Sequence, residues 1–299
     1  MIPPKLKALL RSMRNHSLLD GLEPRYSCND YSSFLNPVWF AGLENHSQVI
    51  SPGRSGTRWL ANVILEATNA FICHASPKTL SEVGYLFDRS LISEEEALGA
   101  YRFSRLDYLS YASMKQRAFV DLDCKNSPIA QVVAKSYPNC RFIVILRNPI
   151  SFIKSGIIRE YFLAKNPQAW GHLEPSSLDG DAFLAAEDVQ IYKIASFWRR
   201  IARLSQQFRD EAPSRVLIVD SSAMFKDAKV VNSLLEWLSI SHRDVAASRA
   251  WPRIANSNKK HIVLTPEQSK LLESDFLYDF CIDGLDDEFV AATGSLKTG

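Results

Sequence analysis

Short apolar runs alternate along the chain with segments in which apolar residues recur every three or four positions. The strand-like runs lie at about 47–51, 70–74, 119–125, 140–146 and 215–220. Segments with helical spacing include 59–66, 78–87, 93–118, 129–135, 191–208 and a segment through 234–238. Short apolar runs between turn residues are typical of strands, whereas the three- and four-residue spacing is typical of amphipathic helices. The alternation predicts an α/β fold in which a central, mostly parallel sheet is flanked by helices.

The run at 140–146 is the clearest strand, because its residues are almost continuously apolar, as in a strand covered on both faces of a parallel sheet. With the run at 119–125 and the helical segment at 129–135 it predicts a right-handed βαβ unit. Ligands of such sheets bind at the carboxyl ends of the strands. Residues directly after the strand-like runs are therefore the first candidates for a binding site.

Length and composition predict one domain that spans 1–299. With 46% apolar residues the chain can bury a large core. We expect 1–46 to form an irregular lead-in whose basic start, 1–11, is a short amphipathic helix packed on the domain or lying on a membrane surface. The segment 156–190 is predicted to be a lid or an acceptor-binding insertion. No apolar run approaches the ~20 residues that span a bilayer.

The overall charge and the cysteines narrow the class of protein. A formal net charge of +2 favours neither nucleic acid nor an anionic membrane as the partner. The five cysteines are an odd number, are widely spread and form no Cys-x-x-Cys pair. This usage predicts reduced thiols in a cytoplasmic protein and no structural zinc site.

The segment from Ser51 to Arg58 joins the first strand-like run to a helix and contains two glycines. Gly53 and Gly56 allow the backbone to approach an anion closely, and the helix that follows offers unpaired N–H groups. Arg54 and Arg58 add charged, planar donors that suit phosphate or sulfate. We therefore predict an anion-binding loop here.

This loop lacks the lysine of the ATP-binding P-loop. In that motif a glycine is followed, after four residues, by Gly-Lys-Ser/Thr. If Gly56 is taken as the second glycine, Thr57 stands at the lysine position and Ser51 at the position of the first glycine. Mg-dependent phosphoryl transfer therefore lacks the side chain that reaches the γ-phosphate.

Two further basic residues end strand-like runs. Arg147 begins the sequence Arg-Asn-Pro, and Ser155 lies eight residues later, about two helical turns on. A charge at the end of a buried strand is costly without a partner, so we predict that Arg147 and Ser155 bind one anion together. Lys125 begins the sequence Lys-Asn-Ser-Pro, 22 residues before Arg147.

These three motifs, in this order, resemble those of sulfotransferases that use 3′-phosphoadenosine 5′-phosphosulfate. The 5′-phosphosulfate loop of that family reads Pro-Lys/Arg-Ser-Gly-Thr-(Thr/Arg)-Trp in many members, and the segment from Arg54 to Trp59 matches it closely. Their 3′-phosphate motif is Arg-Asn/Asp-Pro with a serine eight residues after the arginine. Lys125 matches the lysine of Lys-x-His-x-Pro or Lys-Ser/Asp-Pro. The resemblance covers roughly 47–240 and implies the P-loop-like sulfotransferase fold.

The resemblance also implies a role for each matching residue. The loop residues Arg54, Ser55, Gly56, Thr57 and Arg58 would hold the 5′-phosphosulfate, and Trp59 would stack on the adenine. Arg147 and Ser155 would bind the 3′-phosphate. Lys125 and Arg54 would neutralise the bridging oxygen as the bond to sulfur breaks. The implied activity transfers a sulfuryl group to a hydroxyl or amine of a glycan, lipid or small-molecule acceptor, and requires no metal.

The general base is open, because Ser127 stands where cytosolic sulfotransferases have their histidine. One candidate is His74, at the end of the second strand-like run, since imidazole accepts a proton near neutral pH. The other is Glu82, in a segment that loosely resembles the Glu-Val-His-Phe-Phe stretch of heparan sulfotransferases, where the glutamate is the base.

Two departures and two alternatives complete the prediction. The usual Tyr-Glu-Asp after the late strand is replaced by Asp220-Ser221-Ser222, and Lys259 and Lys260 lie in a late basic loop like the one that often closes the family's 3′-phosphate site. The alternatives are a P-loop kinase-like phosphotransferase that lacks its lysine and a non-catalytic nucleotide-binding protein.

Overall fold

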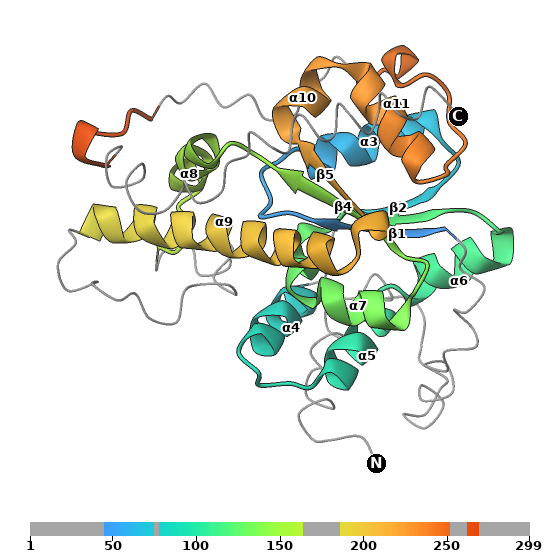
Figure 1. The fold of residues 1–299 in the computed structure, drawn as a ribbon, viewed down its shortest axis with the longest axis horizontal. Helices are drawn as coiled ribbons and strands as arrows, with labels where there is room; N and C mark the ends of the chain where they lie inside the picture. The colour runs from blue at the N-terminus through green and yellow to red at the C-terminus, as the bar shows by residue number, and fades with distance from the viewer. Residues whose placement is uncertain (1–44, 75–77, 164–185, 252–261, 269–299) are drawn as a thin grey trace, which may run out of the picture.

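A five-stranded parallel sheet forms the centre of the computed structural model, which describes residues 45–74, 78–163, 186–251 and 262–268 (Figure 1). The strands are β1 (His46–Ile50), β2 (Phe71–Cys73), β3 (Phe119–Asp121), β4 (Arg141–Leu146) and β5 (Val216–Asp220). Their order across the sheet is β2-β3-β1-β4-β5, and every neighbouring pair is parallel. The prediction of an α/β fold with a mostly parallel sheet is confirmed.

The two faces of the sheet are covered by different helices. On one face lie α3 (Thr57–Ala67), α10 (Ser221–Lys226) and α11 (Ala228–Trp237). The other face carries α4 (Lys78–Asp88), α5 (Glu94–Ser104), α6 (Leu106–Lys115), α7 (Ala130–Ser136), α8 (Pro149–Ile158) and α9 (Ala186–Glu211). Alternate residues of β4 join opposite cores: Ile143 packs with α3 and α11, whereas Phe142 packs with α9. A strand buried on both faces explains why this run is continuously apolar.

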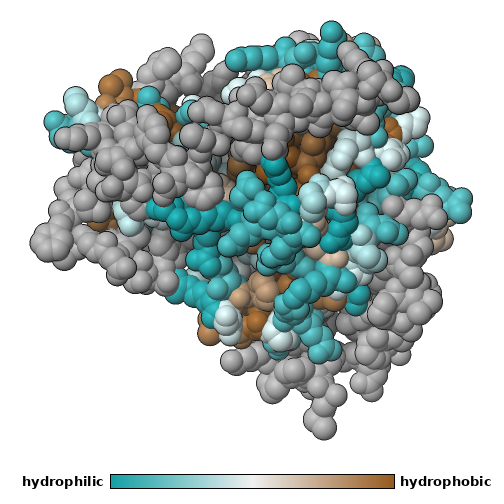
Figure 2. Space-filling model, viewed as in Figure 1, coloured by the Kyte–Doolittle hydropathy of each residue, from teal (hydrophilic) through white to brown (hydrophobic). Residues whose placement is uncertain are grey.

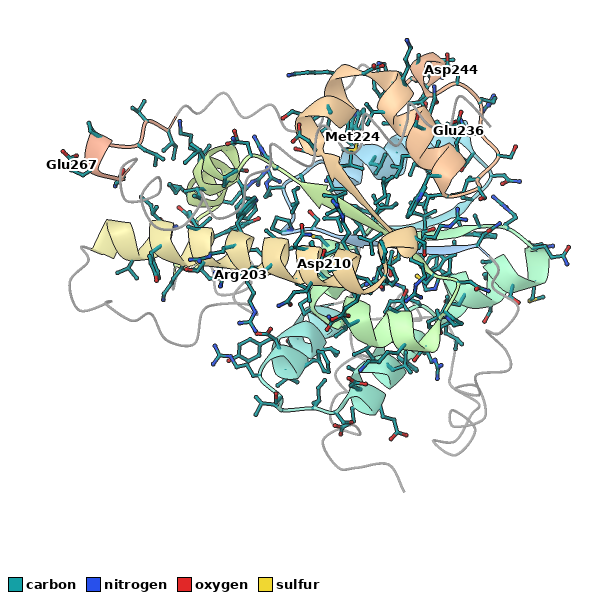
Figure 3. All side chains as sticks on the ribbon, in the orientation of Figure 1. Arg203, Asp210, Met224, Glu236, Asp244 and Glu267 are labelled. Atoms are coloured by element: carbon teal, nitrogen blue, oxygen red, sulfur yellow. The ribbon has the colours of Figure 1, made fainter. Side chains whose placement is uncertain are left out.

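The long helix α9 is amphipathic, and its polar side forms much of the surface in the view of Figure 2. Arg203 and Asp210 lie on its exposed side (Figure 3), whereas Trp198 and Phe208 are buried against the sheet. Met224, by contrast, is a fully buried residue of α10. Hydrophobic burial of one helical face is what holds these layers together.

Two predicted segments divide where local hydrogen bonds redirect the backbone. The run at 119–125 ends as a strand at Asp121, and Cys124–Ile129 forms a 3₁₀ helix, η2. It begins there because the Asp123 side chain accepts a hydrogen bond from the backbone of Lys125. The region 93–118 forms two helices, α5 and α6, and Ser93 caps the first through a reciprocal bond with Glu96.

Several predictions lie outside the described residues. They are the lead-in before residue 45, most of the predicted insertion at 156–190, and the late loop that contains Lys259 and Lys260. No disulfide joins the described cysteines, Cys73, Cys124 and Cys140, to one another. Within the described ranges, no helix combines the length and the apolar character needed to cross a membrane.

Candidate active site

The segments that follow β1, β2, β3 and β4 meet at one edge of the sheet. All five strands are parallel, so their carboxyl ends lie together. They bring four parts of the chain to the same edge: the loop from Ser51 to Arg58, which we call the glycine loop, His74, η2 and the start of α8. These segments carry the three motifs that the sequence singled out.

The glycine loop is held in a left-handed backbone conformation at three positions. The φ angles are 82° at Gly53, 55° at Arg54 and 91° at Gly56. A Cβ atom on Gly56 would also lie 2.3 Å from Cζ of Phe225 in α10. Both the positive φ and the packed phenyl ring therefore require glycine at position 56. The hydroxyl of Ser51 stabilises the turn by accepting a hydrogen bond of 3.1 Å from the amide of Gly53.

Arg54 joins the first motif to the second. Its Nε donates to Oγ of Ser155 over 3.1 Å, and its carbonyl oxygen accepts from Nη1 of Arg147 over 3.1 Å. Trp198 of α9 in turn donates from Nε1 to the carbonyl of Arg147, at 3.0 Å. The structure thus places Arg147 and Ser155, predicted to share one anion, on either side of the same loop residue.

The two guanidiniums of Arg54 and Arg147 lie half-buried without a carboxylate partner among the described residues. Burial lowers the pKa of Arg54, and the Arg159 guanidinium adds to the shift. Burial also lowers the pKa of Arg147, and the charge on Arg54 lowers it further. Two like charges drawn out of water are unfavourable until an anion neutralises them. This group of side chains is suited to binding phosphate or sulfate.

Lys125 lies on η2, next to the glycine loop. Ser127, two residues later, is fully buried and accepts a hydrogen bond of 3.0 Å from the amide of Ser51. Its hydroxyl also lies 2.7 Å from the carbonyl oxygen of Cys124 and 3.1 Å from that of Ser51. The serine at the position where cytosolic sulfotransferases have a histidine therefore joins η2 to the loop here.

His74 lies at the loop, as its place after β2 predicts. Its Nε2 is 3.2 Å from the hydroxyl of Thr57, the first residue of α3. Burial lowers the pKa of His74, and the charges of Arg58 and Lys125 lower it too, while Asp121 acts in the opposite sense. The neutral imidazole is thereby favoured at pH 7, which is the form that accepts a proton. Glu82, the rival base, is exposed on α4.

Comparison with solved structures relates this arrangement to known proteins. A sulfotransferase from Alicyclobacillus acidocaldarius superposes with a TM-score of 0.51 at 14% identity, over 82% of this chain and 95% of that one. This chain has the sulfotransferase fold. The sulfotransferase domain from the curacin biosynthetic pathway also matches, with a TM-score of 0.45 at 13% identity over 67% of this chain and 76% of that chain. No protein-family model matches, and no curated protein does.

Within this sulfotransferase fold, Trp59 occupies a place that differs from its implied role. Only 2% of its surface is exposed, and its ring packs against Phe225 and Trp251 with centroid distances of 4.9 and 5.3 Å. A ring covered in this way has no face to offer an adenine in this conformation. We therefore assign Trp59 to the packing of α3 and do not carry its stacking role further.

Three buried residues that support the fold of the site were not predicted from the sequence. Arg105, at the junction of α5 and α6, forms ion pairs with Asp121 and Asp123. The available signal was the presence of two aspartates in the short apolar run at 119–125, because carboxylates are seldom fully buried unless they are paired. Their partner, Arg105, lies in a predicted helical segment, where an arginine is ordinarily expected to be exposed to solvent. Among the described residues, no cluster of His, Cys, Asp and Glu gathers as metal ligands.

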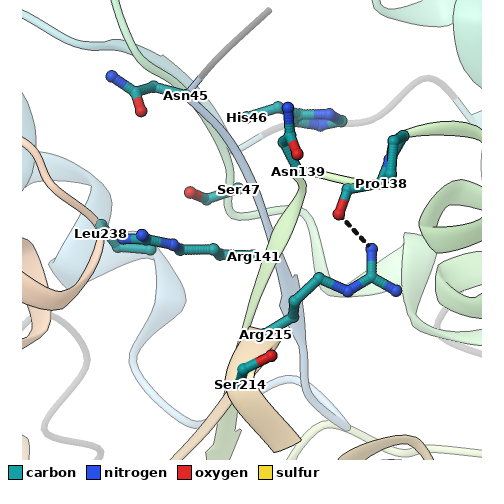
Figure 4. Close-up of a pocket in the computed structure, with 9 residues that line it drawn as sticks. All are labelled: Asn45, His46, Ser47, Pro138, Asn139, Arg141, Ser214, Arg215 and Leu238. Atoms are coloured by element: carbon teal, nitrogen blue, oxygen red, sulfur yellow. Dashed lines mark hydrogen bonds between the residues drawn. The ribbon is translucent and has the colours of Figure 1, made fainter. Parts of the chain in front are cut away.

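A pocket of about 350 Å³ lies away from these motifs, at the amino ends of β1, β4 and β5 (Figure 4). Its two arginines are already held by backbone carbonyl groups: Arg141 bonds to Trp237, and Arg215 bonds to Pro138 over 2.8 Å. None of the residues predicted for the site lines it. The carboxyl edge is thus the place where the candidate chemistry gathers.

Proposed function

We propose that this chain is a sulfotransferase that moves a sulfuryl group from 3′-phosphoadenosine 5′-phosphosulfate to an acceptor hydroxyl or amine. The observation that carries this proposal is Arg54, which bonds to both Ser155 and Arg147 and lacks a carboxylate partner in the described part of the chain. A donor with anionic groups at both the 5′ and the 3′ positions matches two basic motifs that converge on one loop. The sulfotransferase fold supports the same assignment.

Each residue then has a defined task. The backbone from Arg54 to Arg58 binds the 5′-phosphosulfate, and Arg147 and Ser155 bind the 3′-phosphate. The acceptor oxygen or nitrogen forms a bond to sulfur while the bond from sulfur to the 5′-phosphate oxygen breaks. Lys125 and Arg54 stabilise the charge that this oxygen gains, and lysine and arginine do so without a metal. The acceptor's proton passes to His74 or, in the rival assignment, to Glu82.

The proposed acceptor is a glycan, a lipid or a small molecule. The proposed location of the protein is the cytoplasm. A non-catalytic nucleotide-binding protein is the second candidate. It is favoured by one observation: Ser127, at the position where cytosolic sulfotransferases have their histidine base, bonds η2 to the glycine loop. Transfer of radiolabelled sulfate from the donor to pools of acceptors, in the presence of EDTA, separates the two. Labelled product confirms transfer without a metal, whereas nucleotide binding with no product in any pool supports the second candidate.

The donor site has its own test by calorimetry. We expect 3′-phosphoadenosine 5′-phosphate to bind about 10- to 100-fold more tightly than adenosine 5′-phosphate, because charge-assisted hydrogen bonds contribute about 1.5–3 kcal/mol. Arg147→Met should abolish this preference. Lys154→Met is the matched control, because it removes one charge from α8, the helix that follows Arg147, and leaves Ser155 in place. Equal affinity of the wild-type protein for both nucleotides would refute the 3′-phosphate assignment.

A further inference from the structure

Arg105 is the most deeply buried arginine among the described residues, with 1% of its surface exposed. Its Nε donates to Oδ2 of Asp121 over 2.7 Å, and its Nη2 donates to Oδ2 of Asp123 over 3.0 Å. Both carboxylates are buried, at 0% and 3% exposure. One guanidinium therefore holds two aspartates that flank the end of β3.

The other hydrogen bonds of these aspartates lead to η2. Oδ1 of Asp123 accepts from the backbone amide of Lys125 at 3.2 Å, and Oδ2 of Asp121 accepts from the Asn126 side chain at 2.7 Å. Asp121 also accepts from the backbone amide of Asp123, at 3.1 Å. Only one side chain thus separates the guanidinium of Arg105 from the backbone of Lys125.

The same network continues to the glycine loop. Nε2 of Gln48 in β1 donates to the carbonyl oxygen of Asn126 over 3.2 Å, and Ser51 and Ser127 bond as described above. A 3₁₀ helix of six residues with Pro128 inside it has few strong hydrogen bonds of its own. Its position therefore depends on contacts from outside, and these hydrogen bonds are among them.

Charge makes Arg105 central to the network. Burial and the neighbouring Asp121 carboxylate raise the pKa of Asp123 to about 6, against the opposing charges of Arg105 and Lys125. Burial, the largest single effect, disfavours the charged form of Arg105, but Asp121, Cys73 and Asp123 together outweigh it and raise the pKa of the guanidinium. Without this cation, two buried carboxylates would lie side by side, which is strongly unfavourable.

We propose that Arg105 is a positioning residue for sulfuryl transfer, which holds Asp121 and Asp123 so that η2 presents Lys125 to the glycine loop. This inference rests on the proposed function, because Lys125 acts only if the transfer occurs. Arg105 touches neither donor nor acceptor in this assignment. Arg105 holds Asp123, Asp123 holds the backbone of Lys125, and the position of Lys125 affects the rate of transfer.

Turnover and nucleotide affinity should respond differently to loss of this network. A displacement of about 1 Å costs up to about 100-fold in rate, so Arg105→Lys and Asp123→Ala should each lower kcat by about 10- to 100-fold. The affinity for 3′-phosphoadenosine 5′-phosphate should stay within about twofold, because Arg54, Arg147 and Ser155 are untouched. The double variant should lose little more than either single variant, since both interrupt one path.

Tyr101→Phe is the matched control. It removes a buried hydrogen bond of 2.9 Å to His46 from α5, the helix that Arg105 ends, and leaves the side chains of Arg105, Asp121 and Asp123 in place. We expect its kcat to stay within about twofold of wild type. If Arg105→Lys behaves like Tyr101→Phe, or if the effects of Arg105→Lys and Asp123→Ala multiply in the double variant, the proposal is wrong.

Amide hydrogen exchange separates this proposal from the proposed function. Exchange at Lys125 and Asn126 should be faster in Arg105→Lys than in Tyr101→Phe, whether or not the protein transfers sulfate. Unchanged exchange at these two amides would overturn the positioning role. A wild-type protein that neither binds the nucleotide nor transfers sulfate would refute the proposed function, whereas the exchange result judges the network independently.

Discussion

A single buried arginine, Arg105, and a pair of arginines, Arg54 and Arg147, form two groups of charge at the same edge of the sheet, and these charges are balanced in opposite ways. Arg105 is paired with two buried aspartates, whose attraction raises its pKa despite burial. Arg54 and Arg147 are half-buried beside each other, and burial lowers the pKa of both. Arg105 finds its counter-charge inside the protein, whereas the other two lack one among the described residues.

This difference distinguishes a structural charge from a binding charge. A buried ion pair with satisfied hydrogen bonds specifies the local backbone, here the path from β3 into η2. A pair of guanidiniums that repel each other is less stable until an anion arrives, and is then stabilised by it. Arg105 and its aspartates hold the backbone at Lys125, and Arg147 contacts Arg54. Both groups of charge therefore lie next to the proposed transfer site.

The largest expected effect concerns His74, whose pKa is lowered by burial and by the charges of Arg58 and Lys125, while Asp121 opposes the shift. His74→Ala should reduce turnover by about 10²–10⁴-fold, the usual contribution of a positioned base. Nucleotide affinity should be nearly unchanged. Because the lowered pKa keeps the imidazole neutral, wild-type turnover should persist as pH falls to 6.5 and decline only below it.

Glu82→Gln is the companion variant, because it keeps the shape of the side chain and removes its basicity. Turnover near wild type in His74→Ala, together with an inactive Glu82→Gln protein, would transfer the role to Glu82. Activity in both variants would indicate an acceptor that is already nucleophilic, such as an amine or a phenolate.

The next effect compares the two arginine groups directly by unfolding in denaturant. Arg105→Met should lower the free energy of unfolding by about 3–5 kcal/mol, because two buried carboxylates lose their cation. Arg147→Met should leave it unchanged or raise it slightly in the absence of nucleotide, because the repulsion from Arg54 is relieved. Equal destabilisation by both substitutions would remove the distinction between structural and binding charge.

The smallest effect is a pH dependence that belongs to Asp123. Its pKa in the folded protein is raised to about 6, so between about pH 6 and pH 4 the folded state binds more protons there than the unfolded state. The contribution of Asp123 to the free energy of unfolding should therefore increase as pH falls through this window, by at most about 1.4 kcal/mol per pH unit.

Asp123→Asn should remove this contribution, as measured by denaturant midpoints of both proteins between pH 4 and pH 7. Asp121, Arg105 and Lys125 face the carboxylate of Asp123, and Cys73 of β2 and Tyr108 of α6 lie around the same network. None of these is altered in the variant, so the difference between the two curves reports Asp123. Parallel curves would show that Asp123 keeps an ordinary pKa.

Much of the candidate site could be proposed from the sequence because its parts are local. The glycine loop, Arg147 and its serine, and Lys125 each lie within a short segment whose spacing determines which side chains share a face. Trp59 shows where this reasoning ends. Its motif implies an exposed ring, but the ring is covered by Phe225 and Trp251, which come from distant parts of the chain.

The amino-acid sequence by itself determined the strands, the helices and the glycines of the loop, since these depend on periodicity and on the φ angles that a residue can adopt. Only the tertiary structure decided that Ser155 contacts Arg54, 101 residues away, and that Ser127 contacts Ser51, 76 residues away. Those contacts depend on the strand order, which places β1 between β3 and β4. Hydrophobic periodicity records which face of a strand is buried but not which strand lies beside it.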